Sequence, residues 1–470
     1  MQKIVLIFSI LLSVNWQYAQ CYKQIAIGGD HAIAIGPNNE LIGWGRNMFA
    51  IGSPIPFPES QPSPIVLNNT SNWVKIWAQG IMTFAVKDDN TMWAMGTNNF
   101  GALGIGQSGS TSTLMQVSTN ANWVKLSSYN NHTIGIRADG TIWTWGSNQD
   151  GEVALGPGMP PQIYSPTQVG TANHWVDVAT TTTASLAVRN DGTVWGAGVA
   201  LGPLLGQGPD PTNVLRQANY SVGGSQQHSN IAKIKGGASF ILAQKTDGTL
   251  VAWGANEFGE LAMPLTYFGG STPQSIGTDT WLDFAVGREH VLAIKTDGTL
   301  WAWGRNQYGQ LGLGHTNNVN VPTQVGTAND WVQVQAGGIA NSMGIKADGS
   351  VWVWGRNNYG QFGNGTTTQS TVPLQNTAIC VQTLSTPTYT KPTLSIAPNP
   401  AKDYLQLNYT KTQDAHINIY DVQGRVVYQN TVKDFEGHIT IPVHQWQKGL
   451  YMVHIQNNEG ESITKKVLVH

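Results

Sequence analysis

The stretch WLDFAVGREHVLAIKTDGTLWAWGRNQYGQLGLG, from Trp281 to Gly314, decides the fold. Its three short apolar runs predict three β-strands, because none of them has helical periodicity. The runs span 281–286, 290–295 and 299–303. Asp297-Gly298 separates the second run from the third, and such a pair between apolar runs predicts a hairpin with a type I′ turn. Gly304 ends the third run, and a loop rich in Gly and Asn follows.

Six other stretches of the chain repeat this unit. The residue before the strand-ending Gly recurs 50 to 56 residues apart, at Trp44, Met95, Trp145, Ala197, Trp253, Trp303 and Trp354. A fourth extended run follows each Gly-rich loop, and its Pro residues, such as Pro322, suit an outer edge strand. A long period with several strands per unit is typical of a propeller blade. The sequence therefore predicts an all-β fold, a seven-bladed β-propeller with about four strands per blade.

Composition limits the classes of function. The chain has 470 residues, of which 11% are charged, and a net charge of −2. Nothing in this balance attracts nucleic acid or an anionic membrane. Carboxylates are few and scattered, so acid–base catalysis is not favoured. The 18 Trp residues lie mostly at fixed repeat positions, where each buries roughly 150–250 Å² against the next blade.

The chain divides into four segments. Residues 1–20 resemble a secretory signal peptide, with an apolar run too short to span a bilayer. Residues 21–384 hold the repeats, and 385–393 are a linker rich in Ser, Thr and Pro. Residues 394–470 lose the Trp-Gly signature and alternate as strands, which predicts a small C-terminal β-sandwich.

The two cysteines mark the ends of the repeat region. Cys21 directly precedes Tyr22, which occupies the blade-opening Trp position, and Cys380 falls within a residue or two of the next such position. The ends of a closed ring meet, so we predict a Cys21–Cys380 disulfide, which is consistent with an exported chain. Two buried thiols are the alternative. Cys21 could also carry a lipid, but Gln20 stands where a small residue would be needed.

The repeat resembles the regulator of chromosome condensation repeat. The Asp-Gly-Thr hairpin, Trp-x-Trp-Gly and Asn-x-x-Gly-Gln-Leu-Gly carry this resemblance over all seven units. It implies a seven-bladed propeller. The secreted bacterial type, such as β-lactamase inhibitory protein II, implies binding of a protein on one face of the ring. Nucleotide exchange on a nuclear GTPase is not expected of an exported chain.

The tail resembles the sorting domain of type IX secretion substrates. Five ordered matches carry the resemblance: 396–400 (IAPNP), 403–405 (DYL), 419–425 (IYDVQGR), 448–451 (KGLY) and 465–469 (KKVLV). It implies export across both membranes, with residues 394–470 recognised by the type IX machinery. The signal peptide would be removed, and the C-terminal domain is commonly removed as well. The protein would then be secreted or held at the outer cell surface.

Two repeated features have a metal-binding interpretation and a structural one. His31, His132 and His290 share one repeat position and could be ligands, but each belongs to a different packed blade. We interpret them as blade-core histidines. The Asp-Gly pairs could bind calcium, but a hairpin turn needs no ion. We expect no metal and no cofactor.

The loops after Trp-Gly are the candidate binding site. Arg46, Arg305 and Arg356 share one position on blades that become contiguous when the ring closes, and three residues later the loops carry aromatic side chains. The aromatic residues are Phe49, Phe100, Phe258, Tyr308 and Tyr359. Arg beside exposed aromatics is typical of binding hot spots. Alternatively, the aromatics cap the blade packing and the Arg side chains are solvated.

Two irregular insertions, 53–64 and 203–230, could add to a binding face or be neutral.

Nucleophile triads, phosphate loops and paired carboxylates are not found in the sequence. We therefore expect a monomeric, non-enzymatic module that binds an extracellular protein or glycan, with no transmembrane segment and no nucleic-acid partner. An exported polysaccharide-active enzyme with a site in the central channel is the alternative.

Overall fold

A computed structural model describes residues 20–47, 59–70, 72–118, 122–129, 131–199, 212–218, 229–382, 394–409, 415–432, 437–457 and 462–470. The expected signal peptide up to residue 19 and the linker 385–393 lie outside them. The chain forms two compact units, residues 1–383 and 384–470. The described residues contain no helix with the length and hydropathy of a membrane span.

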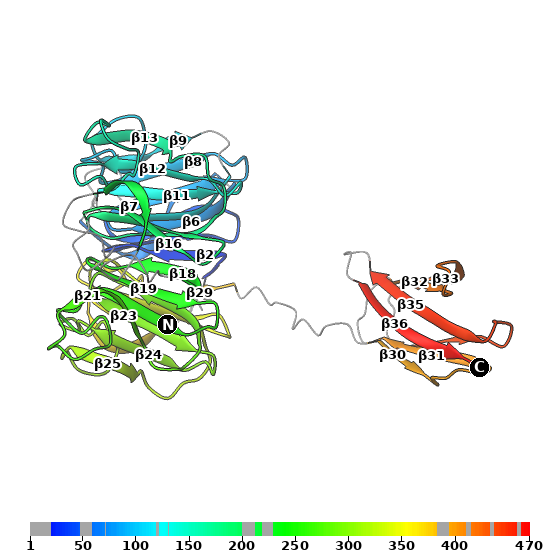
Figure 1. Ribbon diagram of the computed structural model, residues 1–470. Coiled ribbons are helices and arrows are strands. Elements are labelled where there is room, and N and C mark those ends of the chain that lie inside the picture. The colour runs from blue at the N-terminus through cyan, green and yellow to red at the C-terminus, as the bar shows by residue number, and fades with distance from the viewer. Residues whose placement is uncertain are drawn as a thin grey trace, which may run out of the picture. The chain divides into compact units, whose positions relative to one another are not determined.

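The described part of the first unit forms seven sheets, one per repeat (Figure 1). Blades 1 to 3 comprise β2 (Gln24–Ile27), β3 (His31–Ile35), β4 (Leu41–Arg46) and β5 (Ser60–Asn68); β6 (Trp73–Gln79), β7 (Met82–Lys87), β8 (Met92–Gly96) and β9 (Thr111–Ser118); β10 (Trp123–Tyr129), β11 (His132–Arg137), β12 (Ile142–Ser147) and β13 (Gln162–Gln168). Blades 4 and 5 comprise β14 (Trp175–Thr180), β15 (Ala184–Arg189), β16 (Val194–Gly198) and β17 (Thr212–Gln217); β18 (Ile231–Gly236), β19 (Phe240–Lys245), β20 (Leu250–Ala255) and β21 (Gly269–Ser275). Blades 6 and 7 comprise β22 (Trp281–Val286), β23 (His290–Lys295), β24 (Leu300–Gly304) and β25 (Val319–Gln324); β26 (Trp331–Ala336), β27 (Asn341–Lys346), β28 (Ser350–Gly355) and β29 (Ser370–Val381).

The blades close into a ring. Their first strands are innermost, and they contact one another in the order β2, β6, β10, β14, β18, β22, β26 and back to β2. Seven hydrophobic clusters fill the spaces between neighbouring blades, and each draws residues from two of them. Because each cluster needs both of its blades, the ring as a whole buries what a single blade would expose. The prediction of a seven-bladed propeller is confirmed.

The third-strand Trp residues show how each blade attaches to the preceding one. The indole of Trp303 is fully buried and donates a hydrogen bond to the Glu260 carbonyl of blade 5, at 2.9 Å. Trp354 bonds in the same way to the Gln310 carbonyl of blade 6, at 2.8 Å. Gly312 is needed beside it, because a Cβ there would lie 3.0 Å from the indole nitrogen of Trp354. The Gly of the Gln-Leu-Gly motif thus makes room for the next blade's Trp.

The ends of the ring meet as predicted. Strand β1 (Gln20–Tyr22) pairs in parallel with β29, with Cys21 opposite Cys380. The two cysteines form a disulfide, so that prediction is confirmed, and the thiol of Cys21 is not available for a lipid. Tyr22 is buried at the blade-opening position and stacks on Trp44 with ring centroids 6.0 Å apart. Strand β1 begins at Gln20, one residue before the expected start of the mature chain.

Two details of the sequence prediction are wrong. The Asp-Gly hairpins are not type I′ turns: Gly298 has φ +81°, but Asp297 keeps a negative φ. The amide of Gly298 bonds to the Lys295 carbonyl, which makes a type I turn followed by a left-handed Gly. Asp297 favours this geometry because its carboxylate accepts hydrogen bonds from the amide and hydroxyl of Thr299, at 3.0 and 2.6 Å.

The predicted insertion 203–230 is not a single loop, because it contains β17, the outer strand of blade 4. Arg216 of β17 pairs with Gly196 of β16. Likewise 53–64 overlaps β5. The other residues of 203–230, apart from Ala218, Ser229 and Asn230, and those of 53–58, lie outside the described residues.

The second unit has two sheets that share one hydrophobic core. Its strands are β30 (Leu394–Ala397), β31 (Tyr404–Tyr409), β32 (Ala415–Tyr420), β33 (Val426–Val432), β34 (Gly437–Pro442), β35 (Gly449–Asn457) and β36 (Ser462–Val469). The sheet orders are β30-β31-β34 and β33-β32-β35-β36. Leu407, Ile417 and Val453 are among the buried residues between them. This is the small β-sandwich expected from the sequence.

Candidate functional site

The candidate residues lie on one face of the propeller. Because neighbouring strands in a blade are antiparallel, the first-to-second and third-to-fourth connections lie at the same end of every blade. We call this end the loop face. The opposite end, which carries the Asp-Gly hairpins, is the turn face. The loops after Trp-Gly join third to fourth strands, so every candidate side chain of the described residues belongs to the loop face.

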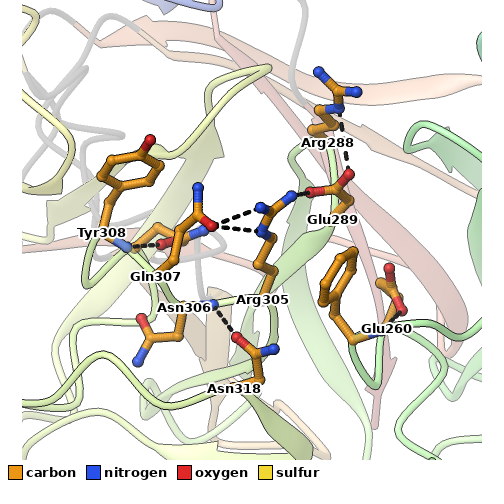
Figure 2. Close-up of polar contacts among 10 residues, drawn as sticks. Glu260, Arg288, Glu289, Arg305, Asn306, Gln307, Tyr308 and Asn318 are labelled. Carbon is orange, nitrogen blue, oxygen red and sulfur yellow. Dashed lines mark hydrogen bonds and ion pairs between the residues drawn. The ribbon is translucent and has the colours of Figure 1, made fainter.

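Arg305 bridges blades 5 and 6. Its guanidinium lies 4.6 Å from the ring centroid of Phe258 in the preceding blade. Its Nη1 forms an ion pair with Glu289, and its Nε donates to the side-chain oxygen of Gln307 at 3.2 Å (Figure 2). Glu289 also pairs with Arg288 at 3.3 Å. Since Arg305 is held from two sides, its orientation is fixed before any partner binds.

The same arrangement crosses the seam of the ring. Arg356 of blade 7 lies 5.6 Å from the ring of Tyr308 in blade 6, and Arg46 of blade 1 lies 4.5 Å from the ring of Tyr359 in blade 7. Both guanidinium groups pair with the buried carboxylate of Asp30, at 3.6 Å from Arg46 and 3.3 Å from Arg356. Burial raises the pKa of Asp30, while the two Arg residues act to lower it. Asp30 thus fixes two binding candidates that are distant in the sequence.

These six residues, which pair an Arg of one blade with an aromatic ring of the preceding blade, are what we call the Arg–aromatic belt. Its members are Arg46, Phe258, Arg305, Tyr308, Arg356 and Tyr359. The structure contradicts the alternative of solvated Arg side chains, which are only 17–29% exposed and all paired. Phe100 is half-buried outside the belt, because blade 3 has Ser147 at the Arg position. Phe49 lies outside the described residues.

A buried Asn organises the belt loops of blades 6 and 7. The side-chain oxygen of Asn306 accepts the amide of Leu311 at 2.9 Å, and its side-chain nitrogen donates to the Asn317 carbonyl at 3.0 Å. The amide of Asn306 donates to Asn318 at 2.9 Å (Figure 2). Asn357 makes equivalent bonds in blade 7. The Asn of the repeat motif therefore organises the loop that presents Tyr308.

Among the described residues of this face, the most exposed apolar side chain was not predicted from the sequence. Phe268 is 87% exposed and Leu265 is 50% exposed, both in the loop between β20 and β21 of blade 5. The same loop carries Phe258. Neither residue occupies a repeated position, so comparison of the repeats could not identify them.

Glu260 is buried beside the belt and is unusual in its ionisation. Burial raises its pKa to about 7, and the carboxylates of Glu289 and Glu257 add to the shift. Its side chain accepts the amide of Phe258 at 2.8 Å. Gln310 accepts the amide of Tyr308 in the same way in blade 6. The carboxylate of Glu260 thus accepts the same backbone hydrogen bond that a Gln side chain accepts in blade 6, but at a buried position where a charge is poorly solvated.

The shared-position histidines belong to the blade cores. His31 and His290 are buried, and burial lowers the pKa of each to about 4. Their ring nitrogens lie 3.0 Å from the Thr83 hydroxyl and 3.2 Å from the Ser342 hydroxyl of the next blade. His132 is also fully buried. The blade-core interpretation is confirmed, and no group of metal-ligating side chains gathers among the described residues.

The central channel is lined by the innermost strands, and side chains there link neighbouring blades. Asp177 accepts the backbone amide of Ile234 at 2.9 Å, and Asp283 accepts that of Val334 at 3.0 Å. Across the seam, Gln335 donates to the Ile25 carbonyl at 2.7 Å. Both channel carboxylates therefore hold blades together, whereas the polysaccharide-active alternative would need them for catalysis.

Comparisons with known proteins agree with this architecture. Residues 115–398 match the family described as RCC1-like domain, and residues 395–470 match the family described as secretion system C-terminal sorting domain. No curated protein matches the chain.

Among solved structures, Prp20p from Saccharomyces cerevisiae is similar, with a TM-score of 0.62 and 20% identity over 76% of this chain and 87% of that one. Human WBSCR16 has a TM-score of 0.58 and 21% identity over 68% of this chain and 85% of that one. At these identities the likeness concerns the fold.

Proposed function

The chain belongs to the RCC1-like domain family and carries a C-terminal sorting domain that directs type IX export to the cell surface or the extracellular space, and from this premise we propose that its propeller is a non-enzymatic binding module. The partner is an extracellular protein or glycan, and it docks on the loop face. Removal of the signal peptide and of residues 394–470 on export, and a monomeric mature propeller, are parts of the same proposal.

The Arg–aromatic belt is the observation that carries this proposal. Side chains that are already fixed lose little conformational entropy when a partner docks, so a rigid surface gains more from each contact. Arg and aromatic residues are also the types most enriched at binding hot spots. Arg305 keeps 29% of its side chain exposed, and Phe268 extends the apolar part of the surface.

A protein partner is favoured over a glycan by the exposed Phe268 and Leu265. An exposed aromatic side chain is the type of anchor that a pocket on another protein buries. Prp20p, which shares the fold, is described with binding to Gsp1p and histones, so a propeller of this kind can hold proteins.

The test uses the purified full chain as bait in medium from cells that export it. Phe268→Ser with Tyr308→Ala should abolish capture of the partner, because both side chains contribute area without a buried ion pair. Leu282→Ser, at a turn-face residue that is 47% exposed, is the matched control and should capture normally. If the Phe268→Ser/Tyr308→Ala variant captured the partner as well as Leu282→Ser does, the loop face would not be the binding surface. Turnover of polysaccharides by the full chain would contradict its non-enzymatic character.

A further inference from the structure

The central channel is a cavity of about 650 Å³, within the size range of small-molecule sites. Its charge differs from that of the whole protein, whose net charge is −2. Two carboxylates line it, Asp177 and Asp283. The basic lining residues are Lys23, Lys125, Lys233, Lys235 and Arg288. Basic residues thus outnumber acidic ones in the channel lining, although the whole chain has a net negative charge.

The two carboxylates do not neutralise all of these cations. Asp177 uses one oxygen for the amide of Ile234 and the other for the ammonium of Lys125, at 3.1 Å. One oxygen of Asp283 accepts the amide of Val334. Lys233 and Lys235 form no hydrogen bond or ion pair with any residue that the structure describes. Two ammonium groups on β18 therefore face the channel without a bonded partner.

Lys235 is the more unusual of the two. Its ammonium lies 5.4 Å from the ring of Phe284, and the residue is exposed where it lines the channel. Desolvation lowers its pKa, against the opposing effect of Asp283 and Asp177. An ammonium group without a bonded partner is stabilised by an anion placed against it.

An aromatic residue lies on the opposite wall. In a ring of seven, blade 2 is across the channel from blade 5, and Trp77 of β6 is the half-buried aromatic that lines the cavity there. Ala26 and Ala285 also line the cavity. The indole is a surface on which a flat or cyclic ligand can stack, and the ammonium of Lys75 lies 5.6 Å from its ring centroid.

Neighbouring blades contact one another closely at the loop-face end of the channel. The amide of Gly29 bonds to the Gly80 carbonyl at 2.7 Å, and the amide of Ala238 bonds to the Arg288 carbonyl at 2.8 Å. A Cβ on Gly338 would lie 3.6 Å from Gly29. These contacts draw neighbouring blades together at that end, away from the exposed Lys233. The channel site is thus separate from the belt.

We propose that the channel binds a small organic anion whose carboxylate lies against Lys233 and Lys235 and whose ring stacks on Trp77. Two ligand sources share this chemistry: an acidic sugar of the uronate type and an aromatic carboxylate. The site does not depend on the loop-face partner, so either proposal can fail alone.

The test is isothermal titration of the full chain at low salt with sodium D-glucuronate and, in a second arm, sodium 4-hydroxybenzoate. Glucose supplies a ring without the carboxylate, and acetate a carboxylate without the ring. We expect saturable one-to-one binding of at least one of the two probes, and no saturation by glucose or acetate. The arm that binds more tightly identifies the source.

Lys235→Met should weaken that binding at least about tenfold, the effect of losing one hydrogen bond to a charged group. It should leave the fold intact, because no ion pair is broken. Trp77→Leu should weaken it as well. Lys466→Met, on the exposed side of β36 in the other unit, removes the same charge and should bind as the wild type does. Absence of saturation by both probes, equal binding of acetate, or full binding by Lys235→Met would each overturn the proposal.

Discussion

Replacement of Glu260 by Gln should stabilise the propeller at alkaline pH and leave it unchanged in acid. Glu260 is only 3% exposed, and its folded pKa of about 7 compares with an ordinary value of 4.5. Blades 6 and 7 already have Gln310 and Gln361 at this position, each accepting a backbone amide at 2.9 Å. The substitution therefore keeps the hydrogen bond and removes only the charge.

The direction of the pH dependence of stability follows from proton binding to Glu260. Between pH 4.5 and 7 the folded state holds a proton on Glu260 that the unfolded state has released, so stability falls as pH rises through this window. The difference between the folded and ordinary pKa of Glu260 corresponds to about 3 kcal/mol, an upper estimate from 1.36 kcal/mol per pKa unit. The free energy of unfolding of Glu260→Gln should thus exceed that of the wild type by up to about 3 kcal/mol at pH 8, and by about zero near pH 4.

Urea unfolding of both proteins at a series of pH values measures this difference. The variant must be compared with the wild type at each pH, because His31 and His290 also make stability depend on pH. Their lowered pKa values destabilise the fold as pH falls from 6.5 to 4, which is opposite to the effect of Glu260. Glu257→Gln, at an exposed residue of the same loop, removes a carboxylate that only adds to the shift and should reproduce only a minor part of the difference. A stability difference that does not change with pH, or one that Glu257→Gln reproduces in full, would refute the reasoning.

Two further predictions concern the ring. Replacing Cys21 and Cys380 together by Ser should lower the urea midpoint, because the bridge spans 359 residues and the chain-entropy model gives about 6 kcal/mol as an upper value; an unchanged midpoint would show that the seam holds without it. Gly312→Ala should cost more than about 1 kcal/mol, since its φ is +73° and its Cβ would press on the Trp354 indole. Gly314→Ala has a similar φ of +83° with no atom closer than 3.8 Å, so equal losses at both positions would mean that backbone strain alone, and not the indole contact, sets the cost.

The sequence predicted the features that depend on repetition. The number of blades, the first two strands of the 281–314 unit and the pairing of Cys21 with Cys380 all follow from counting repeat positions. The position of a residue within its repeat predicts where it lies, because equivalent positions occupy equivalent places in the ring. For the same reason the contiguity of Arg46, Arg305 and Arg356 was predictable.

Features that depend on contacts between repeats were not predictable. Asp30 precedes a strand as an ordinary polar residue, and only the closed ring places it between Arg46 and Arg356. Phe268 lies in an irregular loop, where no periodic pattern indicates exposure. The turn type was missed because it depends on hydrogen bonds that Thr299 donates to the Asp297 carboxylate, which the Asp-Gly pair alone does not reveal.

The most direct test of the central claim is site-specific photo-crosslinking in cells that export the protein. A photoreactive phenylalanine analogue would replace Tyr308 or Phe268 on the loop face, and Leu282 on the turn face as the control. We predict the same crosslinked partner from both loop-face positions and none from Leu282. Crosslinks from Leu282 alone, or no product from either loop-face position, would contradict the assignment of the loop face as the binding surface.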